Sequence, residues 1–182
     1  MSTLGVIILI IGIMVIAAIG FTLWRQERSK KLRSRFGPEY EQAMREYGSR
    51  DRAEQSLVTR QRRMEKIPIQ PLSARERESF TEEWTKAQAM FVDDPKGSIR
   101  EADRLVCDAM CARGYPMTDF DRRAEDLSVD HPLVVKNYRA AHDIAIRSER
   151  NDASTEDLRR GLVYYRDLFD ELLETNVSGF RS

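Results

Sequence analysis

The sequence predicts an all-α protein with an N-terminal transmembrane helix, a helical stalk and a small bundle of about five helices. Three observations predict this class. Residues 4–24 are apolar and carry no charge, apolar residues recur at helical spacing through the rest of the chain, and no segment alternates with period two for long enough to form a strand. The 182 residues are 41% hydrophobic and 33% charged, which excludes a disordered chain and a polytopic membrane protein.

The apolar segment Leu4–Trp24 predicts a membrane anchor. Its 21 residues would form a helix roughly 30 Å long at about 1.5 Å per residue, which matches the hydrocarbon core of a bilayer. Trp24 stands where an interfacial aromatic residue belongs. A cleaved signal peptide is the alternative, but residues 1–3 have no basic side chain and the apolar run is long. We therefore expect a retained anchor.

The formal net charge of zero hides an asymmetry that predicts the orientation of the chain. All charges follow residue 24: residues 25–35, called the basic segment below, sum to +5, and residues 36–182 sum to −5. Basic flanks stay on the cytoplasmic side, so we expect the N-terminus outside and residues 25–182 in the cytoplasm, at a bacterial inner membrane. The expected contacts with anionic lipid headgroups are Arg25, Arg28, Lys30, Lys31, Arg33 and Arg35. Nucleic acid is not expected, because aromatic residues are not interleaved.

Residues 25–66 are predicted to form the juxtamembrane segment and the helical stalk. The anchor helix should continue to Phe36, where Gly37-Pro38 interrupts it, and one charged helix should then run to about Lys66. Its apolar pattern weakens after Gly48. Contact between two copies of the chain through the anchor or the stalk remains open. Residues 67–72 contain two prolines, which prevent a helix and predict an extended linker.

Residues 73–175 are predicted to form the bundle, and 176–182 a C-terminal tail. Helix starts are indicated by the capping box Ser73–Glu76, by Asp94-Pro95, by Thr118, by Asp130-His131-Pro132 and by Ser154. Gly114 is expected to end one of these helices. Aspartates near helix starts stabilise the helix dipole, so capping is preferred over cation binding for Asp93, Asp94, Asp119, Asp121, Asp130 and Asp157.

A weak candidate site comprises Asp130, His131, Tyr138 and His142. A lone histidine oriented by a carboxylate such as Asp130 could serve as a general base. His131 and His142 are expected on one helix about 16 Å apart, too far to act on one atom, and a structural role is preferred for each. Cys107 and Cys111 share a helix face, and packing is preferred over a metal or redox role. No catalytic residue, metal or cofactor is predicted.

Four motifs carry a family resemblance beyond the apolar anchor. They are Leu32–Tyr40, Phe91–Pro95, Arg113–Pro116 and Leu127–Pro132. With these motifs the chain resembles a family of uncharacterised bacterial proteins that are described as membrane or secreted proteins. The resemblance implies a bacterial source and a single-pass anchored helical protein. It implies no activity and no functional residues.

The expected function is a membrane-anchored cytoplasmic module that is not an enzyme and that binds a protein partner or acts as a scaffold. No GxSxG, P-loop, GxGxxG, HExxH or CxxC motif is present. One alternative is a small ligand-binding or enzymatic bundle around Asp130, His131 and His142. The other is a lipid or envelope-stress sensor that uses the basic segment.

Overall fold

The computed structural model describes the backbone of residues 3–174 and the side chains of residues 11–174, and within these limits the protein is all-α. This part of the chain has eight helices and no strand, which confirms the predicted class. The helices are α1 (Thr3–Phe36), α2 (Pro38–Tyr47), α3 (Arg50–Met64), α4 (Ala74–Met90), α5 (Pro95–Ala112), α6 (Phe120–Asp130), α7 (Val135–Glu149) and α8 (Thr155–Glu174). The predicted tail at 176–182 lies outside the described residues.

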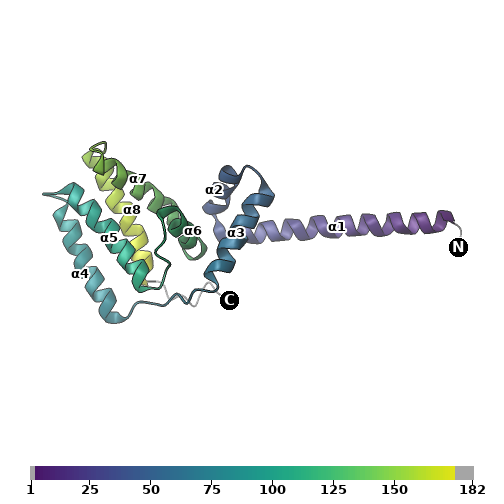
Figure 1. Ribbon diagram of the computed structural model, residues 1–182, viewed down its shortest axis with the longest axis horizontal. Coiled ribbons are helices and arrows are strands. Elements are labelled where there is room, and N and C mark those ends of the chain that lie inside the picture. The colour runs from purple at the N-terminus through teal and green to yellow at the C-terminus, as the bar shows by residue number, and fades with distance from the viewer. Residues whose placement is uncertain (1–2, 175–182) are drawn as a thin grey trace.

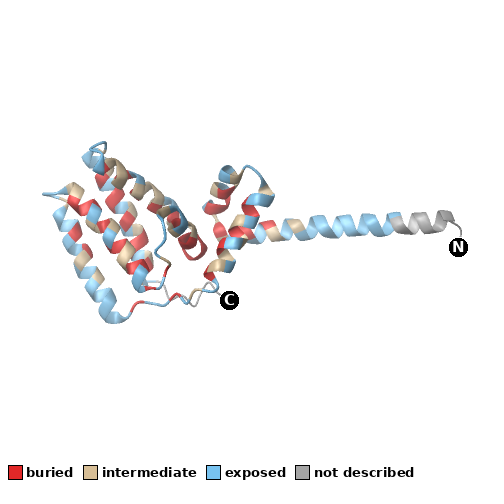
Figure 2. Cartoon of the chain, in the orientation of Figure 1, coloured by how far each residue is buried: buried red, intermediate tan, exposed pale blue. Residues whose placement is uncertain are grey.

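Helix α1 is uninterrupted over 34 residues and has two unlike parts. Residues 11–24 extend away from the other helices and are exposed, although most of them are apolar (Figures 1 and 2). The last turns are packed, with Leu32 and Phe36 buried. Residues 4–10 of the predicted anchor lie outside the residues whose side chains are described. In the described part of the chain, none of the helices has the length and apolar character that a membrane span needs.

The prediction of one charged helix from Pro38 to about Lys66 is wrong. The segment forms two helices, α2 and α3, which pack against each other and against the end of α1 (Figure 1). Gly48 separates them in the left-handed conformation, at φ 64°, and its N–H donates to the Met44 carbonyl at 3.2 Å. A residue with a Cβ adopts this conformation only at a cost, so glycine allows the sharp reversal.

The weak apolar pattern after Gly48 has a structural reason. Arg50 and Glu54, which interrupt the apolar positions of α3, face polar side chains of α1 and α2. Arg50 Nε donates to Ser29 Oγ at 2.9 Å and to Glu54 Oε1 at 3.0 Å, and the Tyr40 hydroxyl donates to the same carboxylate at 3.0 Å. The Ser29 hydroxyl also donates to Glu54. This part of the interior is therefore held by hydrogen bonds as well as by apolar packing.

Helices α4–α8 form the bundle that was predicted from residue 73 onward. Helix α8 packs against both α5 and α7, and α4 packs against α5 (Figure 1). The indole of Trp84 stacks on Phe169 with ring centroids 4.5 Å apart, which fixes α4 to α8. Leu168 and Phe169 are buried at the centre. The buried residues continue without a break from α1–α3 into this bundle, so the two parts share one core.

Several predicted helix ends are confirmed. The Ser73 hydroxyl accepts from the Glu76 N–H at 3.2 Å and the Ser73 N–H donates to the Glu76 carboxylate at 2.8 Å, completing a capping box. Asp94 accepts from the Gly97 N–H at 2.8 Å. Gly114, at φ 89°, follows the end of α5. At α6 the cap is Asp119, one residue after the predicted Thr118.

The prediction that Asp130-His131-Pro132 opens a helix is wrong. Asp130 is the last residue of α6, and the His131 N–H donates to the Leu127 carbonyl at 2.8 Å. Pro132 has no N–H and cannot continue the hydrogen bonds of helix α6, so the chain turns before α7 begins at Val135. Asp130 therefore lies at a helix C-terminus and not at an N-terminus.

Candidate functional site

The four residues of the predicted site separate into two pairs at opposite ends of α6. Tyr138 and His142 lie beside Phe120, the first residue of α6: His142 stacks on its ring at 3.6 Å, and Tyr138 lies at 5.0 Å between centroids. Asp130 and His131 lie at the other end. A helix of 11 residues separates its ends by about 15 Å, so the four side chains do not form one site.

His131 is a buried, neutral imidazole at the junction of α6 and α8. Its residue is 2% exposed, and burial together with the positive charge of Arg113 lowers its pKa to about 4. The Glu171 carboxylate lies 3.5 Å from Nδ1, but that side chain is 45% exposed and does not offset the burial. Among the described residues, neither ring nitrogen makes a hydrogen bond. The imidazole therefore keeps an unused donor and an unused acceptor.

A small cavity opens beside His131. It has a volume of about 170 Å³, and its lining includes Arg35 from α1, Leu133 and Val134 from the turn, and Glu171 from α8. Most of the exposed lining is apolar, and its polar residues are Ser34, Arg35, Asp130, His131 and Glu171. A cavity of this size can hold only a small molecule.

The side chains that surround His131 are engaged with one another. The Tyr115 hydroxyl donates to Asp130 Oδ2 at 3.1 Å, and Arg113 Nη1 donates to the Leu172 carbonyl at 2.6 Å. Burial lowers the pKa of Arg113, although nearby negative groups act in the opposite direction. These bonds fix the end of α5 to α6 and α8. Arg113 and Tyr115 are both buried, so neither side chain is exposed to a partner.

Tyr138 is buried inside the bundle, and His142 is half-buried. Arg123 Nε donates to the Tyr138 hydroxyl at 2.9 Å, and burial raises the pKa of that phenol while it lowers the pKa of His142. Tyr138 is therefore held by a hydrogen bond and by packing, whereas His142 is held by stacking on Phe120 and its Nδ1 makes no hydrogen bond within the described residues.

The two cysteines are free thiols. Cys111 is exposed, whereas Cys107 is partly buried and burial raises the pKa of its thiol. A high pKa leaves little thiolate, so Cys107 is a poor nucleophile. No group of three or more metal-ligating side chains gathers in the part of the chain that the structure describes.

Three residues of the basic segment form exposed ion pairs with carboxylates of the same chain. Arg25 pairs with Asp51, Lys30 pairs with Glu27 at 3.1 Å, and Arg33 pairs with Glu41 at 2.7 Å. The other three basic residues have no carboxylate partner in an ion pair within the described chain. Arg28 lies over the Trp24 ring, Lys31 is exposed and Arg35 is half-buried. Half of the predicted headgroup contacts therefore have carboxylate partners within the chain.

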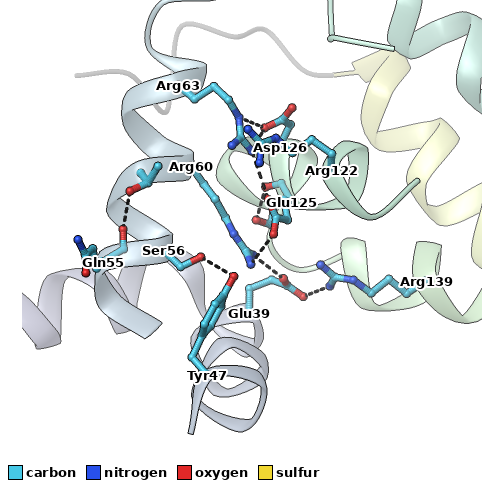
Figure 3. A network of polar contacts seen from close by, with 12 residues as sticks. Glu39, Tyr47, Gln55, Ser56, Arg60, Arg63, Arg122, Glu125, Asp126 and Arg139 are labelled. Carbon is cyan, nitrogen blue, oxygen red and sulfur yellow. Dashed lines mark hydrogen bonds and ion pairs between the residues drawn. The ribbon is translucent and has the colours of Figure 1, made fainter. Parts of the chain in front are cut away.

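A buried network of charges, not predicted from the sequence, joins α2 and α3 to α6 and α7 (Figure 3). Glu39 is 1% exposed and Arg60 is 2% exposed. Arg60 reaches Glu39 at 3.8 Å and Glu125 at 3.1 Å, and Glu39 also pairs with Arg139. Arg63 Nε donates to Asp126 Oδ1 at 2.7 Å. All of these partners except Glu39 and Arg60 lie 62 to 100 residues apart, and such pairs leave no local pattern in a sequence.

A groove between α3 and α6 lies against this network. Its volume is about 430 Å³. Its charged lining consists of Arg52, Arg60, Arg63, Arg122 and Glu125. Four guanidinium groups therefore face one groove that holds a single carboxylate.

The fold and these sites define a small all-α protein whose charged network ties two groups of helices together. No protein-family model, curated protein or solved structure gives a significant match to the chain. The family resemblance noted in the sequence therefore stays a prediction.

Proposed function

We propose that this protein is a single-pass membrane-anchored module whose helical body lies in the cytoplasm and binds a protein partner without catalysis. The observation that carries the proposal is the continuity of α1. One helix begins in the uncharged apolar segment and ends at Phe36, which is fully buried in the core. Residues 11–24 expose apolar side chains that no other described part of the chain covers, as a lipid-facing helix would.

The attachment between anchor and body would be rigid. Only about 18 Å of helix separates Trp24 from Phe36, and α3 contacts α1 within that distance. Arg25 pairs with Asp51, and Ser29 bonds to Glu54 in the interior. A body held in this way keeps a constant height and orientation above the membrane, which favours a scaffold over a flexibly tethered enzyme. The lipid-sensor alternative has less support, because carboxylates already pair with half of the basic segment.

The proposal is tested by cell fractionation and topology reporters. The full chain, expressed in bacterial cells, should stay in the membrane fraction after an alkaline wash. A reporter that works only in the cytoplasm should be active when it is fused after Ser182. The variant Ile13→Arg/Ile16→Arg should leave the membrane, because each mid-span charge costs about 2.5–3.5 kcal/mol. The matched control Ile13→Leu/Ile16→Leu should stay in the membrane fraction.

Either of two results would overturn the anchoring: a wild-type chain that washes off the membrane, or activity only from a periplasmic reporter. Affinity purification of the anchored chain in mild detergent tests the partner. Repeated recovery of the chain alone would contradict an interaction role.

A second candidate function is the binding of a small molecule in the cavity beside His131. The buried imidazole with two unused nitrogens favours it. A small ligand that donates to His131 should shift the ¹⁵N resonances of its ring in the full chain. The substitution Leu133→Arg at the cavity should block that shift, and Val92→Arg, at an exposed apolar residue elsewhere, should not. A fragment screen in which no compound shifts the resonances would remove this candidate.

A further inference from the structure

We propose that the groove between α3 and α6 binds a ligand that carries a phosphate group, with Arg52 and Arg122 as the binding arginines. This inference goes beyond the proposed function and does not depend on the membrane anchor. It rests on the balance of charge at the groove, on the pairing of its one carboxylate and on a hydroxyl donor that remains unused there.

The charge balance leaves two arginines in excess. The buried network contains three arginines, Arg60, Arg63 and Arg139, and three carboxylates that pair with them. It is therefore neutral by itself. Arg52 and Arg122 line the same groove and are exposed, and neither guanidinium lies within ion-pair distance of a carboxylate in the described chain. The positive charge of Arg122 acts on Asp126, but that carboxylate already pairs with Arg63. The groove thus has two arginines without an ion-pair partner of their own.

The carboxylate at the groove is already occupied. Glu125 accepts from Arg60 at 3.1 Å and from Arg63 at 3.4 Å, one bond on each oxygen. A carboxylate held by two arginines repels an incoming anion much less than a free one. Figure 3 shows Arg60 reaching from α3 toward Glu125 on α6, with Arg122 on the same helix as Glu125. The two excess arginines come from the two helices that border the groove.

An unused donor also remains at the groove. The Tyr47 hydroxyl accepts from Ser56 at 3.1 Å, which leaves its own proton to donate. Guanidinium groups form paired hydrogen bonds to the oxygens of phosphate, so two arginines that line one groove suit a dianionic phosphate as ligand.

A phosphate on a soluble molecule and a phosphate on a lipid headgroup would present the same chemistry to these arginines. The experiment therefore has two arms, both with the full chain. One measures calorimetric binding of inorganic pyrophosphate to the chain in a neutral detergent. The other measures binding of phosphatidic acid from phosphatidylcholine nanodiscs that hold the chain. Binding in the first arm indicates a soluble source, and binding in the second alone indicates a lipid.

The variants separate this site from general attraction to basic surface. Arg52→Gln/Arg122→Gln should weaken binding by about tenfold for each arginine, since a charged hydrogen bond contributes on that order. Both side chains are exposed, so the fold should be kept. The matched control is Arg75→Gln/Arg100→Gln, at exposed arginines outside the groove, which should bind as wild type does. The proposal is overturned if the wild-type chain binds neither pyrophosphate nor phosphatidic acid. It is also overturned if the groove variant and the control variant lose the same affinity.

Discussion

Substitution of the buried carboxylate Glu39 by glutamine should destabilise the protein more than any change at a surface ion pair. Glutamine keeps the shape of the side chain and removes its charge. Glu39 is 1% exposed, and it contacts both Arg60 and Arg139. After the substitution Arg60 remains buried with Glu125 as its only carboxylate partner among the described residues.

The magnitude follows from the surroundings of the two arginines. Removing one partner of a buried ion pair costs about 3–5 kcal/mol when the remaining charge has no compensation. Arg60 keeps Glu125 at 3.1 Å, and Arg139 has a side chain 27% exposed that can turn toward water. Both features lower the cost, so we expect a loss of about 2–3 kcal/mol in the free energy of unfolding.

The assay is urea denaturation of the full chain in a mild non-ionic detergent, with unfolding monitored by circular dichroism. Glu101→Gln is the control, because Glu101 pairs with Arg104 on the surface and such pairs contribute about 0–1 kcal/mol. Arg60→Met combined with Glu39→Gln should recover part of the stability, since no unpaired charge is then buried. A loss at Glu39 no larger than the loss at Glu101 would refute the reasoning.

Three further predictions concern single side chains. The pKa of His131 is about 4 when folded and about 6.5 when unfolded, so protonation favours unfolding. Stability should therefore fall by up to about 3 kcal/mol as the pH drops from about 6.5 to about 4, and His131→Leu, compared by urea denaturation at both pH values, should remove most of this dependence. Trp84→Ala should cost about 3–5 kcal/mol in the same assay, because it removes the ring that stacks on α8, whereas a loss below 1 kcal/mol would contradict that packing. Iodoacetamide should alkylate Cys111 well before Cys107, as judged by mass spectrometry of peptides, because burial raises the pKa of the Cys107 thiol.

The features that sequence reasoning predicted correctly depend on neighbours within a few residues. The capping box at Ser73 and Glu76, the aspartate cap of α5 and the glycine after α5 each join groups less than five residues apart. Helical spacing of apolar residues likewise indicated the all-α class. These signals are local because helix hydrogen bonds join residue i to residue i+4.

The two incorrect predictions of helix boundaries arise because a proline or a glycine is compatible with more than one local structure. The sequence has a proline after His131, and proline suits both the start of a helix and the turn that follows one. The tertiary structure decides for the turn, where His131 closes α6 and is buried against α8. Gly48 is a similar case, because a glycine can be tolerated inside a helix or can mark a reversal of the chain. The packing of α3 beside α1 decides for the reversal. Local propensity cannot distinguish such cases, because their energies differ through contacts made elsewhere.

The all-α class, several helix ends, the uncharged apolar segment and the basic segment after it could be read from the amino-acid sequence. Packing fixes the remaining features: α2 and α3 fold back beside α1, Asp130 and His131 lie apart from Tyr138 and His142, and Arg60 pairs with Glu39 and Glu125. The physical reason is distance along the chain. Helix caps and the spacing of apolar residues depend on residues within one or two helical turns. Buried charges pair with residues that are distant in the sequence and that come into contact only when the core packs.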